Sequence, residues 1–252
     1  MLSFRCLLMT QEQILDIHRP HIRVSFAKPS PTLSGEVETT MRLGTISDIH
    51  GDWDSLRTAI GVLQNAAVNV LLCAGDLVER GSDDHGVVQL LREHSIPCVQ
   101  GNHDENAVRH AALNADSDAP DDTVLSMDAI DFLSQLPLTQ TFTFRETNIL
   151  LAHATPSDNG APVFQDSSCA SLSKKFKKDL ARMEADILIV GHTHFSFDIR
   201  FKSKRVLNPG SVCNLQSRDS HTCGILDLSD QSFSVLDLTT GSSIEVLVRE
   251  FD

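Results

Sequence analysis

The sequence predicts an α/β (α+β) fold, a four-layer sandwich in which two mixed β-sheets pack together and are flanked by α-helices. In the first half, apolar strand-like runs alternate with segments of helical periodicity, which favours parallel strand pairing. In the last quarter, several short strand-like runs follow one another, which favours antiparallel closure of a sheet. The chain has 252 residues, of which 41% are hydrophobic and 22% charged, so it can bury the core of such a domain.

The elements follow from periodicity and from turn residues. Leu56, Ile60 and Leu63 recur at helical spacing behind Asp54, the expected N-cap. The first half is predicted to contain strands at 41–47, 69–75 and 96–101 and helices at 54–67, 84–94 and 127–136. The second half is predicted to contain strands at 138–144, 148–154 and 185–194, a helix at 167–182, and short strands at 195–201, 205–211, 223–229, 233–238 and 243–249.

Residues 1–40 differ in composition from the rest of the chain. Pro20, Pro29 and Pro31 stand among polar residues, and no hydrophobic period is sustained. Met41 opens the first strong strand and is a candidate for the natural start of the protein. The sequence therefore predicts a flexible N-terminal extension at 1–40 and a single domain at 41–252.

The net charge and the cysteine content indicate which binding partners and which cellular location to expect. The net charge of −13 argues against a basic surface that would bind nucleic acid or an anionic membrane, so the sequence gives no strong sign of either partner. No apolar run reaches the roughly 18 residues of a membrane span. The negative net charge does not exclude a phosphorylated substrate, because bound metal ions can make the local electrostatic field positive. The six cysteines form no CxxC pair, which favours reduced thiols and a cytoplasmic location over three disulfides.

Five short polar motifs each follow an apolar strand-like run: SDIH at 47–50, GD at 75–76, GNHD at 101–104, a histidine at 153, and GHTH at 191–194. In an extended segment, residues two apart point to the same side, so the Asp and His of the first motif should project together, as should the two histidines of the last. Both pairs thus suit a metal ion.

Each motif also has an ordinary explanation when it is taken alone. An Asp-x-His is usually a capped turn, and Gly-Asp is usually a plain turn. The GNHD segment could equally be a turn that opens a helix, with Asp104 near its N-terminus. A single histidine such as His153 is more often a buried, hydrogen-bonded side chain, whereas a His-x-His pair at a strand end favours a ligand role by itself.

The presence of all five motifs together favours a metal site over these separate explanations. All five stand at the carboxyl ends of strands, where open α/β sheets place their ligands. Seven oxygen and nitrogen ligands without cysteine suit two divalent ions, with manganese favoured and iron or zinc as alternatives. The candidate ligands are Asp48, His50, Asp76, Asn102, His153, His192 and His194.

The set of motifs resembles that of the calcineurin-like metallophosphoesterase family, whose pattern runs D-x-H, G-D, G-N-H-[DE], a lone H and G-H-x-H. The resemblance spans residues 41 to about 215. It implies a sandwich of two mixed sheets flanked by helices, and a metal-dependent phosphoric ester hydrolase in which two ions activate a water molecule.

The resemblance also implies a role for each residue. One metal ion would be held by Asp48, His50 and His194, and the other by Asn102, His153 and His192, with Asp76 bridging both. His103 would be no ligand: it would contact the phosphate or protonate the leaving oxygen, oriented by Asp104.

Two branches of the family share features with this chain. GDLVERG resembles the GDxVDRG of serine/threonine protein phosphatases, in which the arginine grips phosphate; Arg80 is either that residue or a solvated turn residue. Gln100 and the absence of tyrosine depart from that branch. The segment HATP and the segment LNPGS at 207–211 resemble the small prokaryote-type phosphodiesterases and phosphatases.

We therefore expect hydrolysis of a small phosphorylated substrate, either a phosphodiester or a phosphomonoester, with Asn102 and Arg80 contacting it. The alternatives are a serine/threonine-type phosphoprotein phosphatase and a non-catalytic protein-binding scaffold of the same fold. The natural substrate and the oligomeric state do not follow from the sequence.

Two charged segments have both an ordinary and a functional interpretation. Lys174, Lys175, Lys177 and Lys178 form either a solvated helix face or a patch that steers an anionic substrate. The acidic segment 114–122 is either a solvated loop or a lid beside the site.

Overall fold

The computed structural model describes residues 40–114 and 125–252. The chain divides into two units, residues 1–34 and 35–252, and the description that follows concerns the second of them. The flexible extension predicted at 1–40 and the acidic segment predicted as a loop or lid lie, apart from their boundary residues, outside the described residues.

The first sheet has the strand order β10-β9-β8-β1-β2. Its strands β1 and β2 are parallel, and its other neighbours are antiparallel. The sheet is therefore mixed. The strands are β1 (Arg42–Ile46), β2 (Val70–Cys73), β8 (Thr222–Asp227), β9 (Ser232–Asp237) and β10 (Ser243–Ile244).

The second sheet has the order β11-β6-β7-β5-β4-β3. Parallel pairs join β11 to β6, β4 to β5 and β5 to β7, whereas β3–β4 and β6–β7 are antiparallel. Its strands are β3 (Thr139–Phe144), β4 (Thr147–Ala152), β5 (Ile187–Ile189), β6 (Ser196–Phe201), β7 (Lys204–Pro209) and β11 (Leu247–Phe251).

Alternation along the central strands builds a layer of apolar side chains on each side of each sheet. Leu72 of β2 and Ile189 of β5 belong to one buried cluster, which fills the space between the two sheets. Leu71, one residue away on β2, belongs instead to a cluster with the first helices. Leu188 of β5 belongs to a third cluster, with the last helix. The predicted four-layer sandwich is confirmed.

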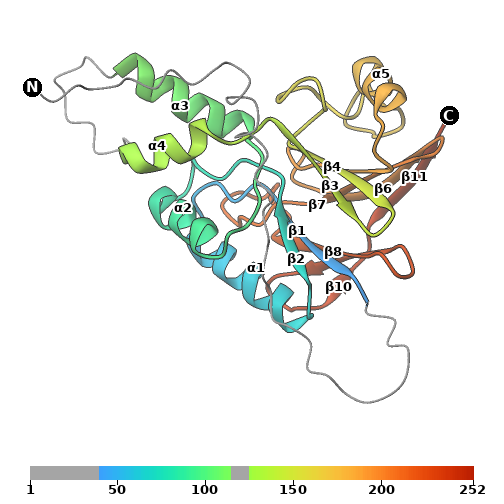
Figure 1. The fold of residues 1–252 in the computed structure, drawn as a ribbon, viewed down its shortest axis with the longest axis horizontal. Coiled ribbons are helices and arrows are strands. Elements are labelled where there is room, and N and C mark those ends of the chain that lie inside the picture. Colours follow the sequence, from blue (N-terminus) through green and yellow to red (C-terminus); the bar gives the residue numbers. More distant parts are fainter. Residues whose placement is uncertain (1–39, 115–124) are drawn as a thin grey trace, which may run out of the picture. The chain divides into compact units, whose positions relative to one another are not determined.

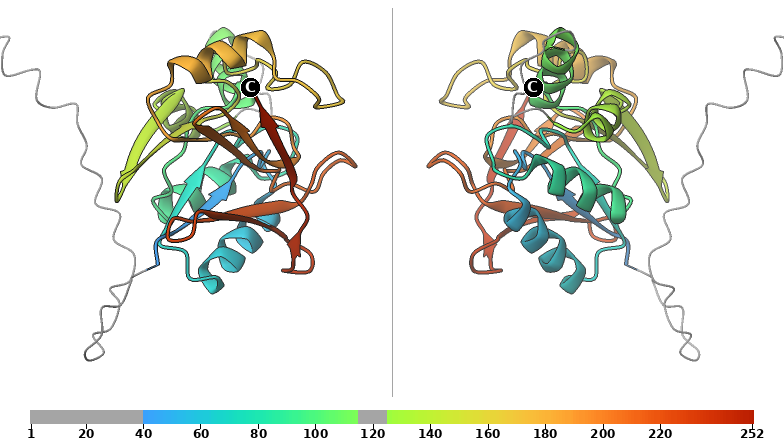
Figure 2. Two further views of the ribbon diagram at one scale, coloured as in Figure 1. Left: turned by 90° about the vertical axis from the view of Figure 1, so that its right-hand side faces the viewer. Right: turned by 90° about the vertical axis from the view of Figure 1, so that its left-hand side faces the viewer.

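The helices cover the two outer faces. On the first sheet lie α1 (Trp53–Asn65) and α2 (Asp84–Glu93), with α3 (Asn102–Asn114) and α4 (Met127–Ser134) beside them (Figure 1). On the second sheet lies α5 (Lys174–Arg182), which buries Phe176 and Leu180. Figure 2 shows α5 and α1 on opposite sides of the sheets. No helix within the described residues is long and apolar enough to cross a bilayer.

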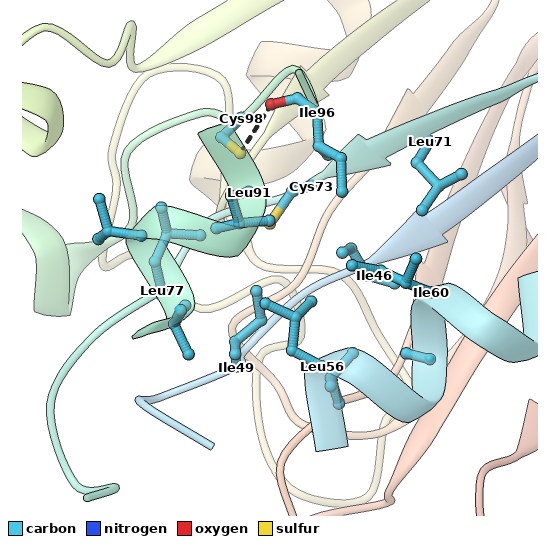
Figure 3. Close-up of a cluster of buried hydrophobic side chains, with 14 of the residues drawn as sticks. Ile46, Ile49, Leu56, Ile60, Leu71, Cys73, Leu77, Leu91, Ile96 and Cys98 are labelled. Carbon is cyan, nitrogen blue, oxygen red and sulfur yellow. Dashed lines mark hydrogen bonds between the residues drawn. The ribbon is translucent and has the colours of Figure 1, made fainter. Parts of the chain in front are cut away.

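The cysteines behave as small apolar side chains. Cys73 and Cys98 are buried among Leu71, Leu77 and Leu91 in the core beneath α1 and α2, where the Cys98 thiol donates to the Ile96 carbonyl (Figure 3). The described cysteines Cys73, Cys98, Cys169, Cys213 and Cys223 are all free. The cytoplasmic location stays a prediction.

The N-cap of the first helix lies two residues earlier than the sequence predicts. Asp52, not Asp54, is its N-cap, because the Asp52 carboxylate accepts from the Ser55 amide. The helix ends at Asn65, and Ala67 adopts a left-handed conformation with φ 54°. Asp54 lies in the first turn, where a negative charge is favourable.

Four other predicted elements were wrong in extent, and one of them is the strand predicted at 185–194, which is limited to β5, Ile187–Ile189. Residues 96–101 form one bridge, Cys73 to Cys98, rather than a strand, since Pro97 has no amide hydrogen to donate. The helix predicted from 167 starts at Lys174, where Ser173 caps it. The strand predicted at 243–249 is divided between β10 and β11, which belong to different sheets.

The lysines of α5 make internal contacts that favour the solvated-face interpretation. Lys175 forms an ion pair with Asp158, and the ammonium group of Lys177 donates to the carbonyl of Asp252 and lies over the Phe201 ring. Two of the four lysine charges are thus already engaged on the protein surface.

Replacing Lys174, Lys175, Lys177 and Lys178 together by glutamine is expected to change kcat/KM by no more than about twofold, since exposed charges are weakly coupled and screened by salt. The measurement is kcat/KM for an anionic phosphoester at low and at high ionic strength. A large loss at low salt that disappears at high salt would instead establish the steering patch.

Candidate metal centre

The candidate ligands lie where the two sheets meet at the carboxyl ends of β1, β2, β4 and β5. The amide of Asp48 donates to the carbonyl of Gly75 over 3.0 Å, which joins the ends of the first two strands. The amide of Gly191 donates to the carbonyl of His153 over 2.8 Å, which joins the ends of the other two. The amide of His192 then donates to both carboxylate oxygens of Asp48, at 3.1 and 3.0 Å, and so connects the sheets.

Asp48, His50 and His194 form the first group of candidate ligands. Each offers one ligand atom, and these atoms all lie within 4.8 Å of one another. The Nε2 atoms of the two histidines are 3.1 Å apart, and His194 Nε2 is 3.5 Å from Asp48 Oδ1. All three residues are buried.

Asp76, His153 and His192 form the second group, again with their ligand atoms within 4.8 Å of one another. The Asn102 Oδ1 atom lies 3.2 Å from His153 Nε2 and 3.0 Å from His192 Nδ1. Asp76 lies between the groups, since its Oδ2 is 3.2 Å from His153 Nε2 and 3.7 Å from His50 Nε2. The structure thus brings all seven predicted ligand residues together.

Three of the histidines are oriented through Nδ1, which leaves Nε2 facing the centre. His153 Nδ1 donates to the Ala74 carbonyl over 2.7 Å, and His50 Nδ1 to the Val78 carbonyl over 3.3 Å. His194 Nδ1 donates to Asp219 over 2.7 Å. Metal-binding histidines are typically held in this way, so the donor set fits divalent ions. Asp219 lies outside every recognisable motif, and sequence reasoning missed it.

Burial and charge set the protonation of the ligand groups. Burial lowers the pKa of His50 to about 3 and that of His192 to about 4, which keeps both rings neutral and their lone pairs available. Burial opposes the ionisation of Asp76, but the charge of His153 and a hydrogen bond from it hold the pKa of Asp76 below its usual range. Burial raises the pKa of Asp48.

The ligand residues converge through a backbone conformation that the sequence did not predict. Five of them have φ between 51° and 67°, the left-handed region that non-glycine residues seldom adopt. These are Asp48, His50, Asp76, His192 and His194. The expectation that extended alternation aims the D-x-H and H-x-H pairs was therefore wrong, because both follow the last strand residue as turns. The two histidines of GHTH accordingly serve different groups.

The ring of His103, in the first turn of α3, lies between the Glu79 carboxylate and the Arg80 guanidinium. Its Nδ1 donates to the Glu79 carboxylate, and its Nε2 accepts from the Arg80 guanidinium over 3.1 Å. Another nitrogen of Arg80 lies 3.5 Å from His194 Nε2. Arg80 is exposed, yet its charged end faces the candidate ligands, which favours the substrate-binding interpretation over the solvated turn. Glu79 was also missed by sequence reasoning.

Asp104 does not orient His103, contrary to the sequence-based expectation. One of its carboxylate oxygens accepts from the amides of Asp76 and Gly101, and the other from the amides of Leu77 and Val78, at 2.8 to 3.3 Å. Burial and the charge of Asp76 raise the pKa of Asp104 to about 7 despite these four donors. Asp104 therefore shapes the loop that carries Asp76, while the partner of the His103 ring is Glu79.

A family model for the calcineurin-like phosphoesterase superfamily domain matches residues 41–231. The chain belongs to this superfamily. Its phosphoesterases are metal-dependent hydrolases, and this chain has the His and Asp groups to bind metal.

Individual relatives are similar to this chain at low sequence identity. An uncharacterized protein of Methanocaldococcus jannaschii is 23% identical over 68% of this chain and 69% of its own length. Serine/threonine-protein phosphatase 1 of Salmonella typhimurium is 31% identical over 29% of this chain, and the match spans about a third (34%) of that protein. The crystal structure of a metallophosphoesterase from Sphaerobacter thermophilus has a TM-score of 0.57 at 19% identity, covering 82% of this chain and 89% of that one.

Two glycines of the superfamily motifs are required by close packing around the ligands. A Cβ at Gly101 would lie 2.1 Å from Asp76 Oδ1, and one at Gly191 would lie 1.7 Å from the Ser47 hydroxyl. Asn208 of LNPGS stabilises the GHTH turn, because its side-chain amide donates to the Gly191 carbonyl over 2.6 Å. These residues position ligands without being ligands.

The contacts of Asp104 make it important for stability. Asp104→Asn is expected to lower the free energy of unfolding by about 2–4 kcal/mol, because an amide group turns an N–H toward one of the two pairs of backbone donors. The measurement is urea denaturation of the metal-free protein.

The matched control for this change is Asp54→Asn, in an exposed first turn, which should shift stability by less than about 0.5 kcal/mol. Equal urea midpoints for the Asp104→Asn protein and the unchanged protein would contradict the assigned role.

Proposed function

We propose that this chain is a dinuclear metal-dependent phosphoesterase that hydrolyses a small phosphorylated substrate. The observation that carries the proposal is the position of Asp76, whose Oδ2 lies within 3.2 to 3.7 Å of a histidine nitrogen from each ligand group. A carboxylate placed between two sets of oxygen and nitrogen donors suits a bridge between two ions.

Each group of residues would hold one ion. Asp48, His50 and His194 would bind the first, and His153, His192 and the Asn102 carbonyl oxygen the second. The absence of cysteine among these donors favours manganese, with iron or zinc as alternatives. Bound there, the two ions would lower the pKa of a water molecule and neutralise phosphoryl oxygens.

The residues beyond the ligands bind substrate and transfer a proton. The Arg80 guanidinium presents several donors in a planar fork, which matches two oxygens of a phosphoryl group. When a phosphoryl group binds Arg80, His103 Nε2 is released from that hydrogen bond and can take up a proton from water, which it then gives to the leaving oxygen. Glu79 holds the His103 ring in that direction through Nδ1, and the Asn102 side chain lies beside the same position.

A phosphoprotein phosphatase is the second candidate. The specific observation in its favour is that Glu79 and Arg80 of GDLVERG both contact His103, so that this segment lies beside the candidate ligands. The similarity to the Salmonella phosphatase supports the same reading, although it covers 29% of this chain. The departures at Gln100 and the lack of tyrosine favour the small-substrate enzyme.

The test is hydrolysis of bis-p-nitrophenyl phosphate and of p-nitrophenyl phosphate, with Mn²⁺ added and then with chelator. Turnover that requires metal supports the proposal, and the ratio of rates separates a diesterase from a monoesterase. A phosphoserine peptide hydrolysed faster than either substrate would favour the phosphatase reading. Bound metal without hydrolysis of any phosphoester would overturn the proposal in favour of a protein-binding scaffold.

A further inference from the structure

The ring of His194 is bonded to a buried carboxylate, that of Asp219, which accepts three hydrogen bonds. Asp219 Oδ1 accepts from His194 Nδ1 over 2.7 Å, and its side chain is 0% exposed. Asp219 Oδ2 accepts from the amides of Leu215 and Gln216, at 3.0 and 2.7 Å. The Cys213 sulfur also lies within 4.8 Å of ligand atoms of Asp219 and His194. One side chain therefore connects a candidate metal ligand to a loop.

The loop in question, residues 214–218, is exposed along its whole length. It is attached at its start, where the Asn214 amide donates to Asp52 over 3.0 Å, and at its end by Asp219. Asp52 also caps α1 and follows the candidate ligand His50 by two residues. Both ends of the loop are therefore bonded to residues close to the first ligand group: Asp52 is near His50, and Asp219 is bonded to His194.

We propose that Asp219 is a positioning residue that aims His194 Nε2 at the first metal ion and couples the loop 214–218 to occupancy of that ion's site. The inference rests on the proposed two-metal function. The ring of His194 can rotate about its side-chain bonds unless Nδ1 is held, and Asp219 is the group that holds it. The same carboxylate cannot shift to follow the ring without stretching its two hydrogen bonds to the loop.

The coupling works in both directions. If an ordered loop favours the metal-binding orientation of His194, then metal binding favours the ordered loop by the same factor. Within residues 40–114 and 125–252, no such contact joins the second ligand group to a loop: His153 is held by the carbonyl of the Ala74 peptide, and His192 Nδ1 faces Asn102. Loss of Asp219 should therefore affect one of the two ions.

The first test is calorimetric titration of the metal-free full chain with Mn²⁺. Asp219→Asn should weaken one of two binding events about 10–100-fold and leave the other within about twofold, since outer-shell partners contribute affinity of that size. Asp237→Asn is the matched control: Asp237 also accepts from two loop amides, those of Thr239 and Thr240, and in the part of the chain that the structure describes its carboxylate has no hydrogen bond to a candidate ligand. That control should bind both ions as the unchanged protein does.

The outcomes separate this inference from the proposed function. If the unchanged protein binds fewer than two Mn²⁺ ions, the two-metal function fails and the inference fails with it. If it binds two and Asp219→Asn binds both equally well, the inference alone is overturned.

The second test needs no variant, so it holds even if Asp219→Asn does not fold. Hydrogen exchange of the Leu215 and Gln216 amides is measured with and without Mn²⁺. Slower exchange with metal supports the coupling, whereas unchanged exchange at both amides overturns it. The Thr239 and Thr240 amides, bonded to Asp237, serve as the internal reference and should exchange alike in both conditions.

Discussion

Asp76→Asn is expected to reduce metal-dependent hydrolysis by at least about 10²–10³-fold, in the range found when one electrostatic group of a preorganised site is removed. The physical reason is the position of the carboxylate between the two ligand groups, where its negative charge would be shared by both ions. An asparagine offers one oxygen and no charge, so affinity for both ions should fall. The measurements are kcat/KM on an aryl phosphoester and metal content after dialysis.

The control for this loss is Asp230→Asn, an exposed carboxylate whose Oδ1 accepts from the amide of Ser232 in the turn between β8 and β9. It should retain both ions and full activity. An Asp76→Asn protein that keeps two ions and an unchanged kcat/KM would show that Asp76 is no bridging ligand.

His103→Ala should produce the second largest effect, a loss of about 10²–10⁴-fold in kcat, the usual contribution of a positioned general acid. Metal content should be unchanged, since both ring nitrogens of His103 are already bonded to other groups, Nδ1 to Glu79 and Nε2 to Arg80. One of these nitrogens also lies within 4.8 Å of ligand atoms of His50 and Asp76, so the metal content of this variant is measured directly. The loss should be greatest for a poor leaving group such as an alkyl phosphate and smaller for p-nitrophenyl phosphate, whose leaving oxygen needs little protonation.

His110→Ala is the matched control, because His110 is an exposed histidine of the same helix. It should leave kcat unchanged for every substrate. An unchanged kcat of His103→Ala on the alkyl phosphate would remove His103 from the mechanism.

The layers and the seven candidate ligands were predictable because both depend on local sequence. A run such as VLLC has few alternatives to a buried strand, and a polar motif directly after it must lie at a sheet edge. The polar groups stand out because each directly follows such a run.

The supporting contacts were not predictable, since they join residues distant in sequence and carry no pattern. Asp219 lies 25 residues from His194, and Glu79 lies 24 residues from His103. Asp104 was assigned to its sequence neighbour, yet its four donors include three amides of the Asp76 loop. Helix α3 was anticipated only as one of two readings of GNHD, because a helix start and a ligand-bearing turn use the same residues.

The left-handed backbone at five candidate ligands limits which substitutions can be interpreted as chemistry. An alanine or a β-branched residue at Asp48 or His194 would add conformational strain to the loss of a ligand, so a single activity value would mix two causes. Asparagine, aspartate and histidine adopt this conformation more readily than other non-glycine residues. Saturation mutagenesis of these positions would therefore rank side chains partly by backbone preference. A strong signal for asparagine there would not by itself report metal binding, since asparagine suits this backbone and can also offer a ligand oxygen.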